Sequence, residues 1–142
     1  MTVVRLPSAM IDDAFGLGVH FYLYLIGGGG KTTLMFTLAQ HLATTGHAVV
    51  STTSTKILTP APHETGRVAV EHDVERVIAR LRAELPPAGH MTIAKSLRVE
   101  DQMLCGYSAE EVDTVRAARV ADHILVEADG AAGRSIKAHA DH

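Results

Sequence analysis

The sequence has little cysteine and no excess of basic charge, and each of these absences excludes a class of protein. Cys105 is the only cysteine among 142 residues, so no internal disulfide can form, and a reducing, cytoplasmic setting is the simplest interpretation. Lysine and arginine number 13 against 16 acidic residues, which leaves a formal net charge of −3. A nucleic-acid-binding domain shows a basic excess instead, so we expect no nucleic-acid partner.

The sequence also lacks a long hydrophobic run. The longest such run, residues 19–26, is far shorter than the roughly 20 apolar residues that cross a bilayer, so we expect no membrane association. The N-terminus carries one arginine and then two aspartates, which does not match a signal peptide. The nine histidines are scattered without a metal-ligand spacing such as H-E-x-x-H, so we interpret most of them as surface residues.

Apolar residues make up 46% of the chain, and their spacing alternates between strand-like and helix-like patterns. Strands are predicted at residues 21–26, 48–53, 67–70, 91–94 and 124–126. Helices are predicted at residues 10–17, from the glycine run to a cap at Gly46, over 74–81, and after a capping box formed by Ser108 and Glu111. This alternation predicts one α/β domain over residues 1–142, with a mostly parallel sheet and flanking helices.

Four consecutive glycines stand between the first predicted strand and the helix that follows, in the stretch LIGGGGKTTL. Each glycine costs roughly 0.5–1 kcal/mol relative to alanine, and an ordinary tight turn needs only one or two. Because a helix N-terminus attracts anions, the pattern predicts a phosphate cradle. In it Lys31 reaches the β- and γ-phosphates and the Thr32 hydroxyl binds Mg²⁺. The expected nucleotide-binding residues are Gly27, Gly28, Gly29, Gly30, Lys31, Thr32 and Thr33.

The glycine run departs from the complete Walker A pattern, G-x-x-x-x-G-K-[ST]. Counting back from Gly30, the first glycine of that pattern falls at residue 25, which is leucine. A variant with an additional lysine would place it at residue 26, which is isoleucine. The sequence therefore has the GGxGKTT half of that variant without its extra cation, and a mechanism in which such a lysine crosses a dimer interface has no support.

Two acidic residues, Glu127 and Asp129, follow the last predicted strand in the stretch ILVEAD. In P-loop proteins an apolar strand ends in a carboxylate that holds Mg²⁺. We therefore expect at least one of these acids to be a metal ligand together with Thr32, and we take both acids and Lys31 as catalytic candidates. Arg134 is a fourth catalytic candidate, and Lys137 a further cation for stabilising charge on the γ-phosphate. A strand that ends in a solvated acidic turn is the alternative interpretation.

Hydroxyl side chains follow the second predicted strand, in the stretch STTSTK at residues 51–56. Ligands of open parallel sheets bind at the carboxyl ends of the strands. These hydroxyls are therefore candidates for contacting Mg²⁺, a phosphate or the attacking water, although the β propensity of threonine explains their presence equally well.

Taken together, three stretches of the sequence resemble one family. They are GGGGKTTLM at residues 27–35, TTSTKI at 52–57 and VEADGAAGRSIK at 126–137. They resemble the YqeC-type family, in which the corresponding patterns are GAGGKTTLM, TTTTKI and LVEADGAxGxPLKAP. The resemblance spans residues 21 to 137, and its last segment is much more specific than the glycine run. Ser135 and His139 stand where the family has proline.

The family is described as accessory to selenium-dependent molybdenum hydroxylases. The resemblance therefore implies a P-loop NTPase-like protein that binds nucleotide and assists the maturation of such an enzyme, with the molybdenum hydroxylase or its cofactor machinery as client. Family members continue well beyond the position of His142, so we expect the chain to be truncated at its C-terminus.

Three functions are consistent with the sequence. The leading hypothesis is a Mg²⁺-dependent accessory protein that binds ATP or GTP and hydrolyses it slowly. A small-molecule kinase is the second, but Arg76, Arg80 and Arg82 on a predicted helix have the pattern of a solvated face rather than a lid. A non-catalytic nucleotide-binding module is the third.

Self-association is a further expectation, because an open sheet edge invites pairing with another chain. We count about five strands, and the apolar strands around Val49–Val50 and residues 124–126 have no evident edge protection.

Overall fold

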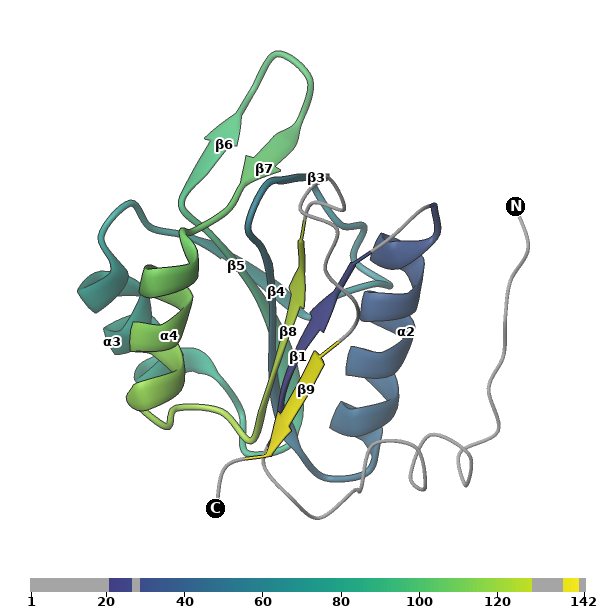
Figure 1. Cartoon of the computed structure of the whole chain (residues 1–142), viewed down its shortest axis with the longest axis vertical. Coiled ribbons are helices and arrows are strands. Elements are labelled where there is room, and N and C mark those ends of the chain that lie inside the picture. Colours follow the sequence, from purple (N-terminus) through teal and green to yellow (C-terminus); the bar gives the residue numbers. More distant parts are fainter. Residues whose placement is uncertain (1–20, 27–28, 129–136, 141–142) are drawn as a thin grey trace.

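The computed structural model of the chain describes residues 21–26, 29–128 and 137–140. Its centre is a six-stranded sheet with the order β4-β5-β2-β8-β1-β9 (Figure 1). The strands are β1 (Phe21–Leu25), β2 (Ala48–Thr53), β4 (Arg67–Val70), β5 (Gly89–Ala94), β8 (His123–Glu127) and β9 (Lys137–Ala140). All neighbours pair in parallel except β9, which runs antiparallel to β1. The predicted α/β class with a mostly parallel sheet is confirmed.

Helices cover both faces of this sheet. Helix α2 (Lys31–Thr44) lies on one face, and α3 (Val74–Glu84) and α4 (Ala109–Ala117) lie on the other (Figure 1). Since side chains alternate along a strand, Leu23 and Leu25 of β1 pack with α2, whereas Tyr22 packs with α3 and α4. None of the described helices is long and apolar enough to cross a membrane. The helix predicted over residues 10–17 lies outside the described residues.

The helix ends follow from local sequence signals. Gly46 adopts a left-handed φ of 100° just after α2. The N–H groups of Gly46 and His47 donate to the carbonyls of Ala43 and Leu42, which is the Schellman arrangement that a C-terminal glycine allows. Ser108 and Glu111 form the predicted capping box at the start of α4. These two predictions are confirmed.

A second, three-stranded antiparallel sheet stands at the carboxyl ends of the main strands. It has the order β3-β7-β6, with β3 at Lys56–Leu58, β7 at Met103–Cys105 and β6 at Ser96–Arg98. We call it the arm, and Figure 1 shows that β6 and β7 project beyond the body of the protein. None of these three strands is predicted from the sequence. Strands of three residues carry too short an alternation to be recognised.

The strands expected to be exposed at a sheet edge lie in its interior. Strand β2, which contains Val49 and Val50, runs between β5 and β8, and β8 runs between β2 and β1. The expectation of open edges at these two strands is therefore wrong. The apolar side chains of Val49–Val50 and of residues 124–126 are explained instead by burial on both faces of a parallel sheet. The count of about five strands is also too low, because the three arm strands and β9 were missed.

Candidate functional site

The carboxyl ends of β1, β8 and β2 meet at one edge of the sheet, next to the N-terminus of α2. The register of the three strands aligns Leu25, Glu127 and Thr53 in one row. Helix α2 begins only six residues after Leu25 along the chain. The fold therefore brings the segment after the glycine run to the predicted acidic segment, although 95 residues separate Thr32 from Glu127 in the sequence.

A short hydrogen bond joins the first turn of α2 to the end of β8. The Thr32 hydroxyl donates to Oε2 of Glu127 at 2.6 Å. Glu127 is buried, with 9% of its surface exposed. A buried carboxylate is costly without partners, so the hydrogen bond from Thr32 stabilises the Glu127 side chain in this position. The bond also places two of the three predicted metal-ligand side chains in direct contact.

Lys31 lies beside this pair. Its Nζ donates to the carbonyl oxygen of Ala128 at 2.8 Å, and the Ala128 N–H donates to the carbonyl of Leu25 at 2.9 Å. The ammonium group is thus held at the same edge as the Glu127 carboxylate, by a neutral carbonyl rather than by an acid. Such a contact is readily exchanged for a stronger, charged acceptor.

The N-terminus of α2 has the features of an anion site. Gly30, the residue that precedes the helix, has φ of 93° and no side-chain cap, a conformation that glycine adopts without strain. The N–H groups of Lys31, Thr32 and Thr33 have no intrahelical acceptor because they belong to the first turn, and no acidic residue stands in that turn. At Gly29 an added Cβ would meet no atom of the described residues within 4 Å. Gly27 and Gly28 lie outside the described residues.

The hydroxyls of residues 51–56 divide into two groups. Those of Ser51 and Thr52 are buried and bond within the sheet, to His90 and Thr92 and to the carbonyl of Ile93 respectively. For Ser51 and Thr52 the hydroxyls are thus engaged within the sheet, which favours the interpretation by β propensity over the ligand contact. Thr53 Oγ1 donates to the carbonyl of Glu127 at 3.0 Å, and the Ser54 N–H donates to the same oxygen at 3.0 Å. This segment thus supports the acidic strand end.

Two predicted catalytic residues, Asp129 and Arg134, lie outside the described residues. Lys137 begins β9, where its backbone pairs with Tyr24 of β1. Of the predicted site residues, the structure brings together Lys31, Thr32 and Glu127, with Thr33, Gly29 and Gly30 in the adjoining turn.

A buried polar cluster was missed by the sequence interpretation. His90 is 8% exposed, and its Nε2 lies 2.7 Å from Ser51 Oγ, while its Nδ1 has no hydrogen-bond partner within the described part of the chain. Burial lowers the pKa of His90 to about 4, and the backbone of Glu64 offsets only part of this effect. His90 and His123 are both buried, so these two are exceptions to the prediction that most of the histidines are surface residues. Their position at the start of apolar strand segments was the available signal.

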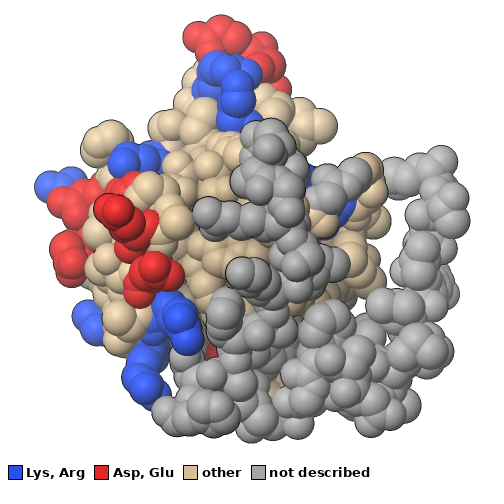
Figure 2. Space-filling model, viewed as in Figure 1, with Lys and Arg blue, Asp and Glu red and all other residues tan. Residues whose placement is uncertain are grey.

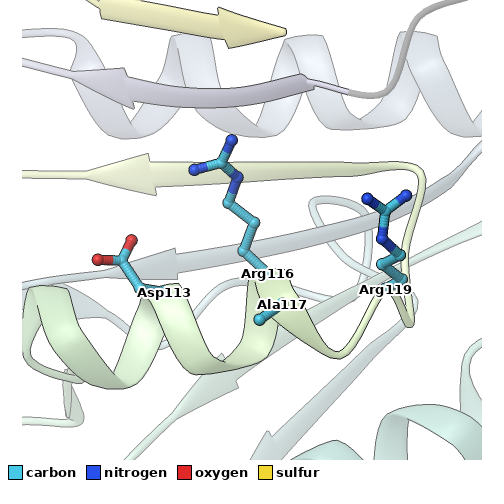
Figure 3. Close-up of a pocket in the computed structure, with 4 residues that line it drawn as sticks. All are labelled: Asp113, Arg116, Ala117 and Arg119. Atoms are coloured by element: carbon cyan, nitrogen blue, oxygen red, sulfur yellow. The ribbon is translucent and has the colours of Figure 1, made fainter. Parts of the chain in front are cut away.

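A pocket on α4 is lined by Asp113, Arg116, Ala117 and Arg119 (Figure 3). Arg116 extends from α4 toward the sheet, where its guanidinium carbon lies 5.2 Å from the centre of the Tyr22 ring. Arg116 stands in the last turn of α4, where a cation offsets the partial negative charge of the helix end. The pocket is therefore explained by the packing of α4 on β1, and we assign it no ligand.

The arginines of α3 behave as the sequence predicted. Arg76 and Arg82 are exposed. Arg80 forms ion pairs with Glu84 at 2.7 Å and Glu71 at 3.5 Å, so its charge is already engaged on the surface of the helix.

Comparisons with known proteins agree on one family. The model of the family described as "YqeC protein" matches residues 23–142. The Escherichia coli protein named "Uncharacterized protein YqeC" is 30% identical over 140 residues, which cover 96% of this chain and 51% of the relative. The chain thus spans about half the length of the curated relative that it matches. No solved structure matches. Because the family model covers most of the chain, including the glycine run and the acidic strand end, this protein belongs to the YqeC family.

Proposed function

We propose that the chain binds a nucleoside triphosphate with Mg²⁺ at the carboxyl ends of β1, β8 and β2, as a P-loop NTPase-like domain. The observation that carries the proposal is the 2.6 Å contact between the Thr32 hydroxyl and the Glu127 carboxylate. A hydroxyl at the start of the helix after a glycine run, and an acid at the end of the neighbouring strand, are the two protein groups that P-loop proteins direct at Mg²⁺.

The phosphates would be bound by Lys31 and by the first-turn amides of α2. Lys31 would exchange the Ala128 carbonyl, 2.8 Å away, for a phosphate oxygen, which is a stronger acceptor because it is charged. Gly29 supports this assignment, since neither a left-handed φ nor a close neighbour among the described residues requires glycine there. A ligand that approaches the backbone closely is the remaining physical reason for a residue without a side chain.

The donor set fits Mg²⁺ rather than a softer metal. Thr32 and Glu127 offer oxygen ligands only, and Mg²⁺ is usually held by one or two carboxylates together with substrate phosphates and water. Within the described ranges no cluster of three or more His, Cys, Asp or Glu side chains could hold a metal by itself. The metal would therefore arrive with the nucleotide, with Asp129 as the second candidate acid. When bound, Mg²⁺ would neutralise part of the negative charge of the phosphates.

Slow hydrolysis of ATP or GTP is the activity we propose for this site, in support of a molybdenum hydroxylase client. The client assignment rests on the resemblance of residues 21–137 to accessory proteins. Transfer to a small acceptor is less favoured, because Arg80 is paired on the helix surface. Steady phosphate release with nucleotide alone indicates an NTPase, release that requires an added acceptor indicates a kinase, and binding without release indicates a non-catalytic module.

Calorimetric titration with ATP and with GTP, each with and without Mg²⁺, tests the binding proposal. Lys31→Ala should weaken binding about 10- to 100-fold, the amount expected from losing a hydrogen bond to a charged group, roughly 1.5–3 kcal/mol. Thr32→Val and Glu127→Gln should reduce the gain in nucleotide affinity that Mg²⁺ provides. Their affinity for nucleotide without Mg²⁺ should differ less from that of the wild type than their affinity with Mg²⁺.

Arg76→Ala is the matched control, since it removes one exposed cation from α3 on the opposite face of the sheet. It should bind as the wild type does. Circular dichroism verifies that each variant is folded. Equal affinities of Lys31→Ala and wild type for both triphosphates would refute the proposed site, and so would the absence of binding by the folded wild type.

A further inference from the structure

The arm carries an apolar row that stops at an open edge. Ile57, Leu104 and Leu97 are register partners across β3, β7 and β6, so their side chains lie on one face of the arm. Ile57 and Leu104 are 3% and 1% exposed, whereas Leu97 is 39% exposed. The row is therefore packed against the body of the protein at two positions and open to solvent at the third.

The arm is also where exposed apolar side chains gather. Among the described residues, the large hydrophobic side chains that are exposed are Leu58 at 64%, Leu97 at 39% and Val99 at 68%. All three belong to the arm or to the turn that follows β6. Within the described ranges β6 pairs on one side only, with β7, so the backbone of its other side is available for a further strand.

The two cations next to this edge, Lys95 and Arg98, are paired with acids of the same chain. The guanidinium of Arg98 bonds to both carboxylate oxygens of Asp101, with Nε at 2.8 and 3.0 Å from them. Lys95 pairs with Glu111 at 3.0 Å. Figure 2 shows acidic and basic side chains next to one another at the projecting end of the molecule. Unpaired lysines are a common protection of edge strands, and this edge does not have that protection.

We propose that β6 pairs antiparallel with β6 of a second copy of this chain, about a two-fold axis at Leu97. Leu97 then faces Leu97 of the other copy, and the apolar row continues into the second arm through its Leu104 and Ile57. Arg98 faces Ser96 of the other copy, so no like charges oppose each other. A two-fold axis at Arg98 would instead place two guanidiniums opposite one another, which is destabilising.

This pairing would join the two copies through their arms, and the helices that cover the main sheet of each copy would stay outside the interface. It is independent of nucleotide binding, because none of its residues belongs to the proposed phosphate or metal site. It replaces the expectation that self-association uses β2 or β8, which are interior strands.

Disulfide trapping tests the proposed pairing. Directly opposed residues of antiparallel strands have Cα atoms about 4.5 or 5.5 Å apart, which is within the range that a disulfide bridges. We would introduce Leu97→Cys in a Cys105→Ser background and follow the covalent dimer on a non-reducing gel under mild oxidation. The matched control is Leu58→Cys in the same background, since Leu58 is the more exposed of the two.

Leu97→Cys should cross-link about tenfold faster than Leu58→Cys or more, because pairing raises the effective concentration of one thiol near the other. Random collision would favour the more exposed Leu58→Cys. Equal or faster cross-linking of Leu58→Cys would therefore overturn the proposal.

Sedimentation of the chain without cysteine substitutions provides a second measurement. The wild type should shift from monomer to dimer as its concentration rises, and Leu97→Lys should remain monomeric while retaining the circular dichroism spectrum of the wild type. A wild type that stays monomeric throughout, or a Leu97→Lys variant that dimerises equally well, would contradict the pairing.

Discussion

Acidification from pH 7 to pH 5 should destabilise the protein through His90. The imidazole is buried between the sheet and α2, with its ring centre 6.0 Å from that of Phe36. Its Nε2 contacts the Ser51 hydroxyl, but Nδ1 has no hydrogen-bond partner among the described residues. Burial of the charged ring lowers the pKa of His90 to about 4, and the backbone hydrogen bond of Glu64, which favours the protonated ring, opposes this only in part.

The sign and the size of the effect follow from linkage. The pKa of His90 in the folded chain is about 4, against an ordinary value of 6.5. Between these values the unfolded chain binds the extra proton and the folded chain does not, so the stability present above pH 6.5 is lost as the pH falls toward 4. The two pKa values correspond to about 3 kcal/mol in total, of which about 2 kcal/mol is lost between pH 7 and pH 5.

Urea denaturation at several pH values, followed by circular dichroism, measures this loss in wild type and in His90→Asn. The difference in free energy of unfolding between the two should change by about 2 kcal/mol from pH 7 to pH 5, because other titrating groups are common to both. His63→Asn is the control, since His63 is an exposed histidine near the same part of α2. If the curves of wild type and His90→Asn stay parallel, His90 is not the titrating group and the explanation fails.

Two further predictions concern the supports of the proposed site. Gly106→Ala should destabilise the fold strongly, because a Cβ there would overlap the carbonyl of Thr53. Gly29→Ala is the control and should melt like the wild type, because an added Cβ meets none of the described atoms there. Similar melting temperatures for the two variants would show that the junction between β2 and the arm adjusts to the added Cβ without loss of stability. Asp129→Asn should reduce the Mg²⁺ dependence of nucleotide binding, because we expect this acid to share the metal with Glu127. If Asp129→Asn and Glu127→Gln both keep the Mg²⁺ dependence of the wild type, the acidic strand end is not the metal site.

The sequence alone was sufficient for the elements whose signals are local. The glycine run marks the start of α2 and Gly46 marks its end, and the pair Ser108 and Glu111 marks the start of α4. The apolar and β-branched runs predicted the ends of β1, β2 and β8 to within about one residue. These signals are backbone conformation, capping and burial on both faces, which depend on a few neighbouring residues.

Tertiary structure alone decided which elements became neighbours. Strand order places β8 between β1 and β2, so Thr32 meets Glu127 across 95 residues, while the hydroxyls of Ser51 and Thr52 turn into the sheet. It also buries His90 and leaves Leu97 exposed at the end of a row whose other members are covered. Periodicity assigns a residue to a face of its own strand, but its burial and its partners depend on which distant segment packs against that face.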